Sequence, residues 1–226
     1  IDPLLGTEED FRTLCERARE RGIRVLLDGV FNHTGRKSVY FNADGFYPSL
    51  GAAQGEQSPY YRWYSFHPFP DDYDAWWGIK NLPAVNETEQ SYVDYIIEGD
   101  NSVIRRWLRA GASGWRLDVA DELPDEFIAR IRRAIEQETP DGYLLGEVWE
   151  DGTTKIAYSK RRKYLLGRET HGLMNYPFRT ALLDFLRGGD AAVFRERMEE
   201  LREHYPAPAF YGAMNFLSTH DTPRLL

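Results

Sequence analysis

The sequence has very little cysteine: Cys15 is the only one among 226 residues. A disulfide bond within the chain is therefore impossible, which agrees with a reducing compartment such as the cytoplasm. The chain also lacks an apolar run near the roughly eighteen residues that a membrane span requires, and its first residues do not read as a charged leader before an apolar segment. We therefore expect no membrane partner.

An excess of positive charge is missing as well. The chain carries 28 basic and 36 acidic residues, which gives a net charge of -8, and no basic run is present. This balance argues against nucleic acid as a partner. Hydrophobic residues make up 42% of the chain, enough to bury a sizeable core in one domain or in one domain with an insertion.

Helical and extended patterns alternate along the chain. Thr7 and Asp10 resemble a capping box that begins a helix, Gly22 ends it, and residues 23–31 form an apolar run typical of a buried strand. Further helices are predicted over 91–110, from Pro124 to before Pro140 and over 179–203, and further strands over 114–119, 143–149, 172–178 and 210–218. This α/β alternation predicts a parallel sheet with right-handed crossovers, either doubly wound or closed into a barrel.

Residues 34–88 interrupt this alternation. Gly, Pro, Ser and aromatic residues crowd together there without sustained periodicity, which predicts an inserted excursion. Most of its aromatic rings are expected to pack in a small satellite core. A few exposed Trp and Tyr rings are candidate platforms for the flat apolar faces of sugars.

Charged side chains follow the predicted strands where each strand ends. In the stretch from Gly114 to Glu122, alternation places Arg116 and Asp118 on one face of a strand. Taken alone, such a pair fits a structural salt bridge better than an active site. The exits of four strands, however, carry polar groups, namely Asp28, Asn32 and His33, then Arg116 and Asp118, then Glu147, then His220 and Asp221. Convergence at one rim is what a barrel active site needs.

The residue types at these exits favour acid and base chemistry. No Ser or Cys stands in a nucleophile-elbow setting, whereas glycoside hydrolysis needs one ionised and one protonated carboxyl group. Asp118 suits the ionised group because the adjacent Arg116 favours the charged form. Glu147 suits the acid because its neighbours Val148 and Trp149 are apolar, and apolar surroundings favour a neutral carboxyl group.

A metal-dependent hydrolase is an alternative reading. Asp28, His33, His220 and Asp221 could ligate a cation, but the sequence lacks the H-x-H and H-E-x-x-H spacings of such sites. A phosphate-binding reading has no glycine-rich loop to support it.

Four ordered segments carry a resemblance to a known family. D-G-V-F-N-H at 28–33, G-W-R-L-D-V-A-D-E at 114–122, G-E-V-W at 146–149 and L-S-T-H-D at 217–221 resemble the signature regions of the α-amylase family, glycoside hydrolase family 13. W-W-G-I-K-N-L-P-A-V-N at 76–86 is similar to a fifth region of its neopullulanase, cyclomaltodextrinase and maltogenic amylase branch. The resemblance implies part of a (β/α)8 TIM barrel: residues 1–33 begin the barrel (domain A), 34–88 form domain B inserted after the third strand, and 89–226 continue the barrel.

The resemblance also implies a role for each matching residue. Asp118 would be the nucleophile, Glu147 the acid/base, and Asp221 the residue that binds ring hydroxyls and stabilises the transition state. Arg116 would hold Asp118 in position. The further substrate-binding candidates are His33, His220, Trp149 and Asn86, and the structural ones are Asp28 and Asn32, the latter touching calcium in many relatives.

The implied activity is retaining hydrolysis of α-1,4, and in some members α-1,6, glucosidic bonds in maltodextrins, cyclodextrins, pullulan or starch. The chemistry would require no cofactor, although calcium at Asn32 stays open. An α-glucan transglycosylase and a non-catalytic amylase-like binding protein are the alternatives. The partners would be an α-glucan substrate and, in the full-length protein, a second copy of the chain.

The sequence departs from the branch pattern in two places. Asp121 stands where the neopullulanase branch often has asparagine, and Glu150 where it often has histidine. Strands one, two and eight of the barrel and the branch's N-terminal domain have no counterpart here. We expect the natural protein to be longer, so that an extracellular location, directed by an upstream signal, stays open beside the cytoplasmic one.

Overall fold

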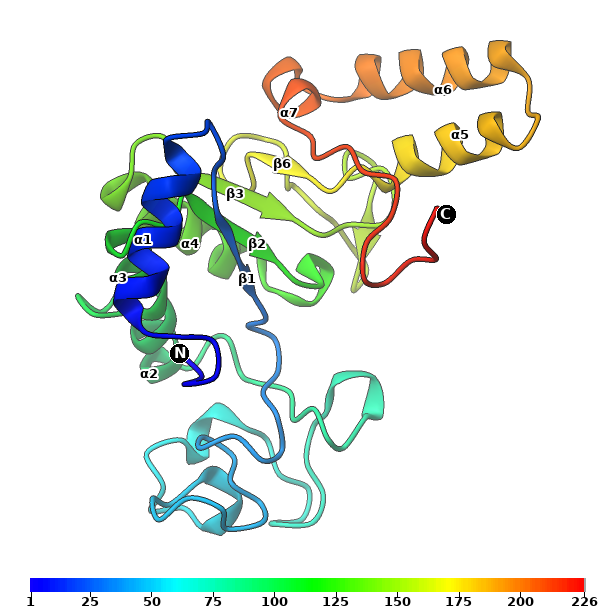
Figure 1. Ribbon diagram of the computed structural model, residues 1–226. Coiled ribbons are helices and arrows are strands. Elements are labelled where there is room, and N and C mark those ends of the chain that lie inside the picture. The colour runs from blue at the N-terminus through cyan, green and yellow to red at the C-terminus, as the bar shows by residue number, and fades with distance from the viewer. Residues whose placement is uncertain (226) are drawn as a thin grey trace.

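The computed structural model describes residues 1–225, in which a parallel sheet is flanked by helices (Figure 1). Within these residues β1 (Leu26–Gly29), β2 (Gly114–Leu117), β3 (Tyr143–Gly146) and β6 (Gly172–Leu173) pair in that order, each parallel to its neighbour. A short antiparallel hairpin consists of β4 (Ile156–Ala157) and β5 (Lys160–Arg161). The predicted α/β class with a parallel sheet is confirmed.

The helices before the third strand lie where the sequence predicts them. The helix α1 (Glu8–Arg19) begins with a capping box, because the Thr7 side chain accepts a hydrogen bond from the Asp10 N–H and the Asp10 side chain accepts one from Thr7. The 91–110 region consists of α2 (Gln90–Val93), which continues as a π-helical turn through Asp94–Glu98, and α3 (Val103–Arg109). The helix α4 (Asp125–Glu138) precedes β3.

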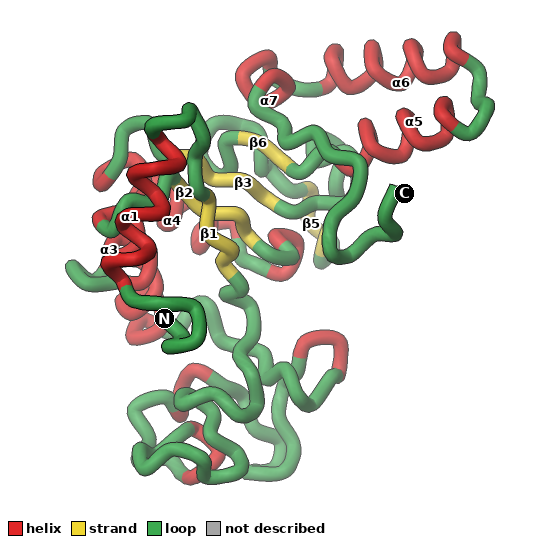
Figure 2. The backbone as a smooth tube through the Cα atoms, in the orientation of Figure 1, coloured by secondary structure: helices red, strands yellow, loops and turns green. Residues whose placement is uncertain are grey.

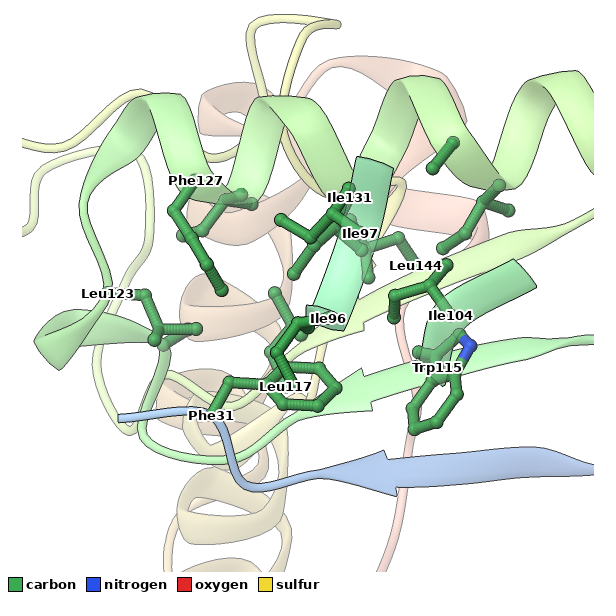
Figure 3. Packing of buried hydrophobic residues seen from close by; sticks show 14 of the residues in the cluster. Phe31, Ile96, Ile97, Ile104, Trp115, Leu117, Leu123, Phe127, Ile131 and Leu144 are labelled. Atoms are coloured by element: carbon green, nitrogen blue, oxygen red, sulfur yellow. The ribbon is translucent and has the colours of Figure 1, made fainter. Parts of the chain in front are cut away.

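The core lies between α4 and the sheet (Figure 3). Phe127, Ile131 and Ile135 form the predicted apolar stripe of α4 and are at most 2% exposed. Figure 3 shows Phe127 and Ile131 above Leu117 and Leu144 of the central strands, and Ile135 belongs to the same cluster. Burial of each such side chain stabilises the fold by roughly 1.5–3 kcal/mol. Since side chains alternate along a strand, Arg116 points to the opposite face of the sheet.

Two predicted strands near the C-terminal end are wrong in extent or type. After β6, Asn175 caps α5 (Tyr176–Leu186) by accepting a hydrogen bond from the Phe178 N–H, so the 172–178 strand ends early. After α6 (Ala191–His204), the start of the predicted 210–218 strand belongs to the helix α7 (Ala207–Tyr211). Pro208 in the first turn of α7 favours helical backbone angles. Met214 alone pairs with the sheet, through a parallel bridge to Met174.

Residues 30–89 form a lobe beyond the C-terminal end of β1 (Figure 2). The lobe contains the single-turn helices Ala52–Gln54, Tyr61–Trp63 and Trp76–Gly78, joined by loops. Its two ends run side by side, since Thr34 donates to the Pro83 carbonyl and Val85 to the Asn32 carbonyl, both at 3.0 Å. Phe41, Trp63 and Tyr64 are buried, as expected for a satellite core, and identification of the lobe as domain B stays a prediction.

None of the helices in residues 1–225 is long and apolar enough to cross a membrane.

Candidate active site

Strand register brings the polar residues of three strand exits together. Asp28 of β1 is paired with Arg116 of β2 in the parallel ladder. Beyond the strand ends, Asp118 donates its N–H to the Gly29 carbonyl at 3.2 Å, and Glu147 donates to the Leu117 carbonyl at 3.0 Å. These backbone bonds place Asp118 and Glu147 next to each other at the C-terminal edge of the sheet, as predicted.

Arg116 connects the three carboxylates. Its Nη1 lies 2.7 Å from Oδ1 of Asp28 and 2.7 Å from Oδ1 of Asp118, and its Nη2 lies 2.8 Å from Oε2 of Glu147. The Arg116 side chain is 10% exposed and that of Glu147 is 4% exposed. Burial lowers the pKa of Arg116. Its hydrogen bond to Asp28 and the charges of Glu147 and Asp28 raise the pKa by more than burial lowers it, so the guanidinium stays charged.

The electrostatic balance at Asp118 differs from the one expected. Burial raises the pKa of the Asp118 carboxyl, the Arg116 hydrogen bond lowers it, and the charges of Glu147 and Asp28 raise it again. The net pKa lies above the ordinary value, so the arginine compensates only part of the cost of burial. The predicted contact is present and lowers the pKa of Asp118 as expected, but burial and the charges of Glu147 and Asp28 outweigh it.

Glu147 is surrounded by hydrogen-bond donors. Oε2 accepts the Val119 N–H at 2.8 Å, and Oε1 accepts Nε1–H of Trp149 at 3.0 Å and the hydroxyl of Tyr176 at 3.4 Å. Val119 adopts a φ of 38°, a left-handed conformation that is strained for a β-branched residue. In this conformation its N–H donates to Glu147. The surroundings of Glu147 are therefore polar, in contrast to the apolar ones expected from Val148 and Trp149.

Tyr176 is a site residue that the sequence analysis missed. Its ring stacks on Trp149 with centroids 4.3 Å apart, and burial followed by the Glu147 charge raises its pKa to about 12. Its position directly after a short strand, with Pro177 opening the next helix, was the available signal. The charge of Asp221 also raises the pKa of Tyr176.

His220 and Asp221 contact each other. Nε2 of His220 lies 3.0 Å from Oδ2 of Asp221, and their side chains are 72% and 39% exposed. In the part of the chain that the structure describes, neither side chain is hydrogen-bonded to Asp118, Glu147 or Arg116. Their predicted roles remain predictions.

The remaining candidates lie in the lobe and its entry. The His33 ring stacks on Trp76 at 5.2 Å; burial lowers the pKa of His33, and the charge of nearby Asp118 opposes this shift. Asn86 closes a local turn, its Oδ1 accepting hydrogen bonds from the Thr88 N–H and hydroxyl. Asn32 is 4% exposed, and its Oδ1 has no hydrogen-bond partner within residues 1–225.

Metal binding stays a prediction. Among residues 1–225, no group of three or more His, Cys, Asp or Glu side chains is arranged to hold an ion. Oδ1 of Asn32 supplies one oxygen, whereas calcium takes about six or more, so calcium at Asn32 would need further oxygen ligands.

Comparison with known proteins shows that the chain is similar to carbohydrate-active enzymes. The alpha amylase catalytic-domain model matches residues 1–226. Over 256 residues the chain is 38% identical to an amylopullulanase of Thermoanaerobacterium thermosulfurigenes, and over 235 residues 34% identical to a cyclomaltodextrinase of Geobacillus thermopakistaniensis. It is 31% identical, with a TM-score of 0.82, to the structure of a cyclic α-maltosyl-(1→6)-maltose hydrolase from Arthrobacter globiformis in complex with maltose.

These similarities cover the chain but only part of each relative. All of the chain aligns with the amylopullulanase and the cyclomaltodextrinase, of which it spans 13% and 37%. Of the chain, 97% aligns with the Arthrobacter hydrolase, of which it covers 47%.

Proposed function

The chain belongs to the α-amylase family of glycoside hydrolases, and from that premise we propose that the protein is a retaining α-glucan hydrolase that cleaves α-1,4 glucosidic bonds. Its substrates would be maltodextrins, cyclodextrins, pullulan or starch, with α-1,6 cleavage as a further activity. The names of the amylopullulanase and the cyclomaltodextrinase support this substrate class.

One observation carries the proposal: two carboxylates from adjacent strand ends contact the same guanidinium. Asp118 lies 2.7 Å from Nη1 of Arg116 and Glu147 lies 2.8 Å from Nη2. Glycosidases of the retaining type need two carboxyl groups about 5–5.5 Å apart, so that one can attack the anomeric carbon while the other serves the leaving oxygen. Contact with one guanidinium holds the pair at short range.

In the proposed reaction Asp118 attacks the anomeric carbon while Glu147 donates a proton to the glycosidic oxygen. The bond to the leaving sugar breaks, and a β-glycosyl ester of Asp118 forms. Glu147, now ionised, removes a proton from water, which attacks the same carbon and regenerates the Asp118 carboxylate. Two inversions leave the released sugar in the α configuration.

The other predicted residues would bind the sugar. We assign Asp221 to ring hydroxyls, His33 and His220 to the sugar that precedes the scissile bond, and Trp149 and Asn86 to further substrate contacts. Trp149 already stacks on Tyr176 beside Glu147, which would position its ring. The mechanism requires no metal step. A homodimer and a cytoplasmic location stay predictions.

The test is release of reducing sugar from cyclodextrin, pullulan and starch by the full-length protein. We expect activity on at least one of them, with product of α configuration, and loss of turnover in Glu147→Gln. Glu150→Gln on the same loop serves as the matched control, because the Glu150 side chain is 63% exposed and bound to Lys155 rather than to the carboxylate pair. A folded protein that hydrolyses none of these glucans would contradict the proposal, and longer oligosaccharides among the products would indicate a transglycosylase.

A further inference from the structure

The turn after β2 connects the two carboxylates of the proposed reaction. It consists of Val119, which directly follows Asp118, and the single-turn helix Ala120–Glu122. The Val119 N–H donates to Oε2 of Glu147 at 2.8 Å. The next N–H, that of Ala120, donates to the Glu147 carbonyl at 3.2 Å. The conformation of this turn therefore determines which backbone donors Glu147 meets.

The backbone at Val119 is strained. Its φ of 38° and ψ of 58° lie in the left-handed region, which a β-branched residue rarely adopts. Such strain persists only where the surrounding structure fixes the backbone. Relaxation to a negative φ would rotate the chain about the N–Cα bond of Val119, so the hydrogen bonds from Val119 and Ala120 to Glu147 could not both be kept. The turn therefore needs a support.

Arg162, directly after β5, binds the carbonyl groups of this turn. Its Nη1 donates to the Asp121 carbonyl at 2.6 Å. Its Nη2 donates to the Leu123 carbonyl at 2.7 Å and to the Ala120 carbonyl at 3.4 Å. A planar guanidinium with five N–H donors can bridge several carbonyls in a fixed geometry, which the ammonium group of a lysine cannot reproduce.

Arg162 is itself held in place by its neighbours. Its side chain is 5% exposed, and its Nε lies 2.8 Å from Oδ1 of Asp125. The guanidinium lies 4.7 Å from the centroid of the Tyr164 ring, and the fully buried Tyr164 donates to Oδ1 of Asp121 at 2.5 Å. Because these contacts are buried, the support is rigid before any substrate binds.

The outer side of the turn is held more weakly. Oε1 of Glu122 accepts Nε1–H of Trp77 at 3.3 Å, and Oε2 accepts the hydroxyl of Tyr158. Trp77 and Tyr158 are 76% and 70% exposed, so water can replace either hydrogen bond at little cost. The side chain of Arg162 is buried, and its bonds to the turn have no such replacement.

The Val119 N–H influences which oxygen of Glu147 carries the proton. Oε2 faces two N–H groups at 2.8 Å, those of Val119 and of Arg116 Nη2, and neither can accept a proton in a hydrogen bond. Oε1 faces Nε1–H of Trp149 and the hydroxyl of Tyr176, and a hydroxyl can also accept. A neutral Glu147 therefore carries its proton on Oε1.

We propose that Arg162 is a positioning residue for the reaction: by binding the carbonyls of the turn after β2, it holds Val119 in the strained conformation in which its N–H donates to Glu147. This inference rests on the proposed α-glucan hydrolase function. It adds to that function a residue that touches neither the substrate nor the carboxylate pair and acts through the backbone.

Steady-state kinetics of the full-length Arg162→Lys protein test this role. The substitution keeps a positive charge beside Asp125 but loses the planar fork. On the glucan that the wild type cleaves best, we expect kcat to fall about 10- to 100-fold, the range of a small misplacement in an active site, with little change in KM. The alkaline limb of the pH profile of kcat/KM should move to higher pH, because the ionised proton donor loses a hydrogen bond.

A second variant tests the route through Val119. Glycine adopts a positive φ without steric cost, so Val119→Gly removes the need for the support. In the Arg162→Lys background, Val119→Gly should restore most of the lost kcat and return the alkaline limb toward its wild-type position. Arg161→Lys, the same substitution at the neighbouring exposed residue, is the control, because Arg161 donates to the Thr153 carbonyl rather than to the turn.

The outcomes separate this inference from the proposed function. A lower melting temperature of Arg162→Lys with unchanged kcat and pH profile would show that Arg162 only stabilises the fold, and would overturn the inference. A loss of kcat that Val119→Gly does not restore would overturn it as well. Both results leave hydrolysis by the wild type intact, whereas a folded full-length protein that cleaves no α-glucan contradicts the proposed function and this inference with it.

Discussion

Arg116 determines the chemistry of the candidate site at the scale of single residues. One guanidinium contacts carboxylates from three neighbouring strand exits, and its single positive charge cannot balance all three. Burial and the other two carboxylates therefore raise the pKa of Asp118. A carboxylate that is incompletely stabilised in the resting protein is a better nucleophile than one held in a strong, isolated ion pair. The raised pKa of Asp118 thus agrees with a catalytic role.

Substitution of this carboxylate is the first prediction. We expect Asp118→Asn to reduce turnover by about three orders of magnitude or more, since an amide cannot form the glycosyl ester. Asp28→Asn is the matched control, because Asp28 contacts the same Arg116 atom but is 50% exposed and has no bond-forming role. Initial rates on the best substrate, with circular dichroism to check folding, give the comparison. An active, retaining Asp118→Asn enzyme would contradict the assignment of Asp118 as the nucleophile.

Glu87 gives a pH prediction. Its pKa in the folded protein is raised to about 8 by burial and by Glu122, whereas an unfolded chain ionises near 4.5. The contribution of neutral Glu87 to stability is therefore fully present below about pH 4.5 and is lost as the pH rises through 8. We expect Glu87→Gln, which is neutral at every pH, to be more stable than the wild type at pH 8 by about 1 to 2 kcal/mol.

Urea unfolding at pH 5 and pH 8 measures this effect. The difference between wild type and Glu87→Gln should grow with pH. Glu56→Gln, at an exposed position of the lobe, should show no comparable trend, and a trend of equal size in both variants would count against a neutral Glu87 in the folded protein.

At the scale of elements, the close packing of β2 on β3 aligns the two carboxylates. Gly114 begins β2 with a φ of 151°, and a Cβ atom there would lie 1.9 Å from the Tyr143 carbonyl oxygen of β3. This position therefore requires glycine for two reasons, the backbone angle and the space.

We expect Gly114→Ala to destabilise the fold by about 3 kcal/mol or more and to reduce activity, because β2 and β3 must separate and shift Asp118 relative to Glu147. Gly35→Ala is the control, since its Cβ would approach no atom closer than 4.0 Å. Thermal unfolding compares the melting temperatures of the two variants. Equal melting temperatures would be inconsistent with the close packing of β2 on β3 at Gly114.

Elements with strong local signals were predictable from the sequence. The capping box of α1 and the buried stripe of α4 depend on neighbouring residues, and both are confirmed. The 210–218 segment has a strand-like composition, but Pro208 starts a helix before it and only Met214 finds a pairing partner. Whether an apolar segment becomes a strand depends on its neighbours in space, which a single sequence does not reveal.

The two departures from the branch pattern are connected in the structure. Lys155 lies 2.8 Å from Oδ2 of Asp121 and also binds Glu150, so both unusual carboxylates share one cation. Tyr164 donates to the other oxygen of Asp121 at 2.5 Å. The loop after β3 is thereby fixed to the turn after β2, a compensation that appears only when positions 121, 150 and 155 are placed in space.

For the molecule as a whole, the sequence predicted the central pair of the site but not its surroundings. Asp118 and Glu147 follow parallel strands, and a parallel sheet must bring such positions to one edge. Trp77 and Tyr158 reach their places through loops whose paths no periodicity encodes, whereas Tyr176 begins α5 shortly after β6. The carboxylate pair and Trp149 were therefore open to prediction from the sequence, and the positions of Trp77 and Tyr158 were not.

The exposed apolar surface of α5, α6 and α7 leads to a last prediction. In Figure 1 the α5–α6 hairpin projects away from the sheet, and it carries Leu186 and Val193, which are 59% and 54% exposed, near a cavity of about 500 Å³ between the two helices. Apolar surface of this kind favours association in water. The net charge of -8 opposes association by repulsion between copies, and salt screens this repulsion.

We therefore expect the 226-residue chain, produced by itself, to bind a hydrophobic dye and to self-associate more strongly as salt is raised from about 20 mM to about 500 mM. The double variant Leu186→Lys, Val193→Lys should weaken both effects, whereas Ile156→Lys on the β4–β5 hairpin, 67% exposed but far from α5 in the chain, should not. Sedimentation velocity at several concentrations measures the association. A chain that stays monomeric in high salt would show that this face is too small or too irregular to drive association, because screening removes the charge repulsion and leaves the apolar surface as the dominant force between copies.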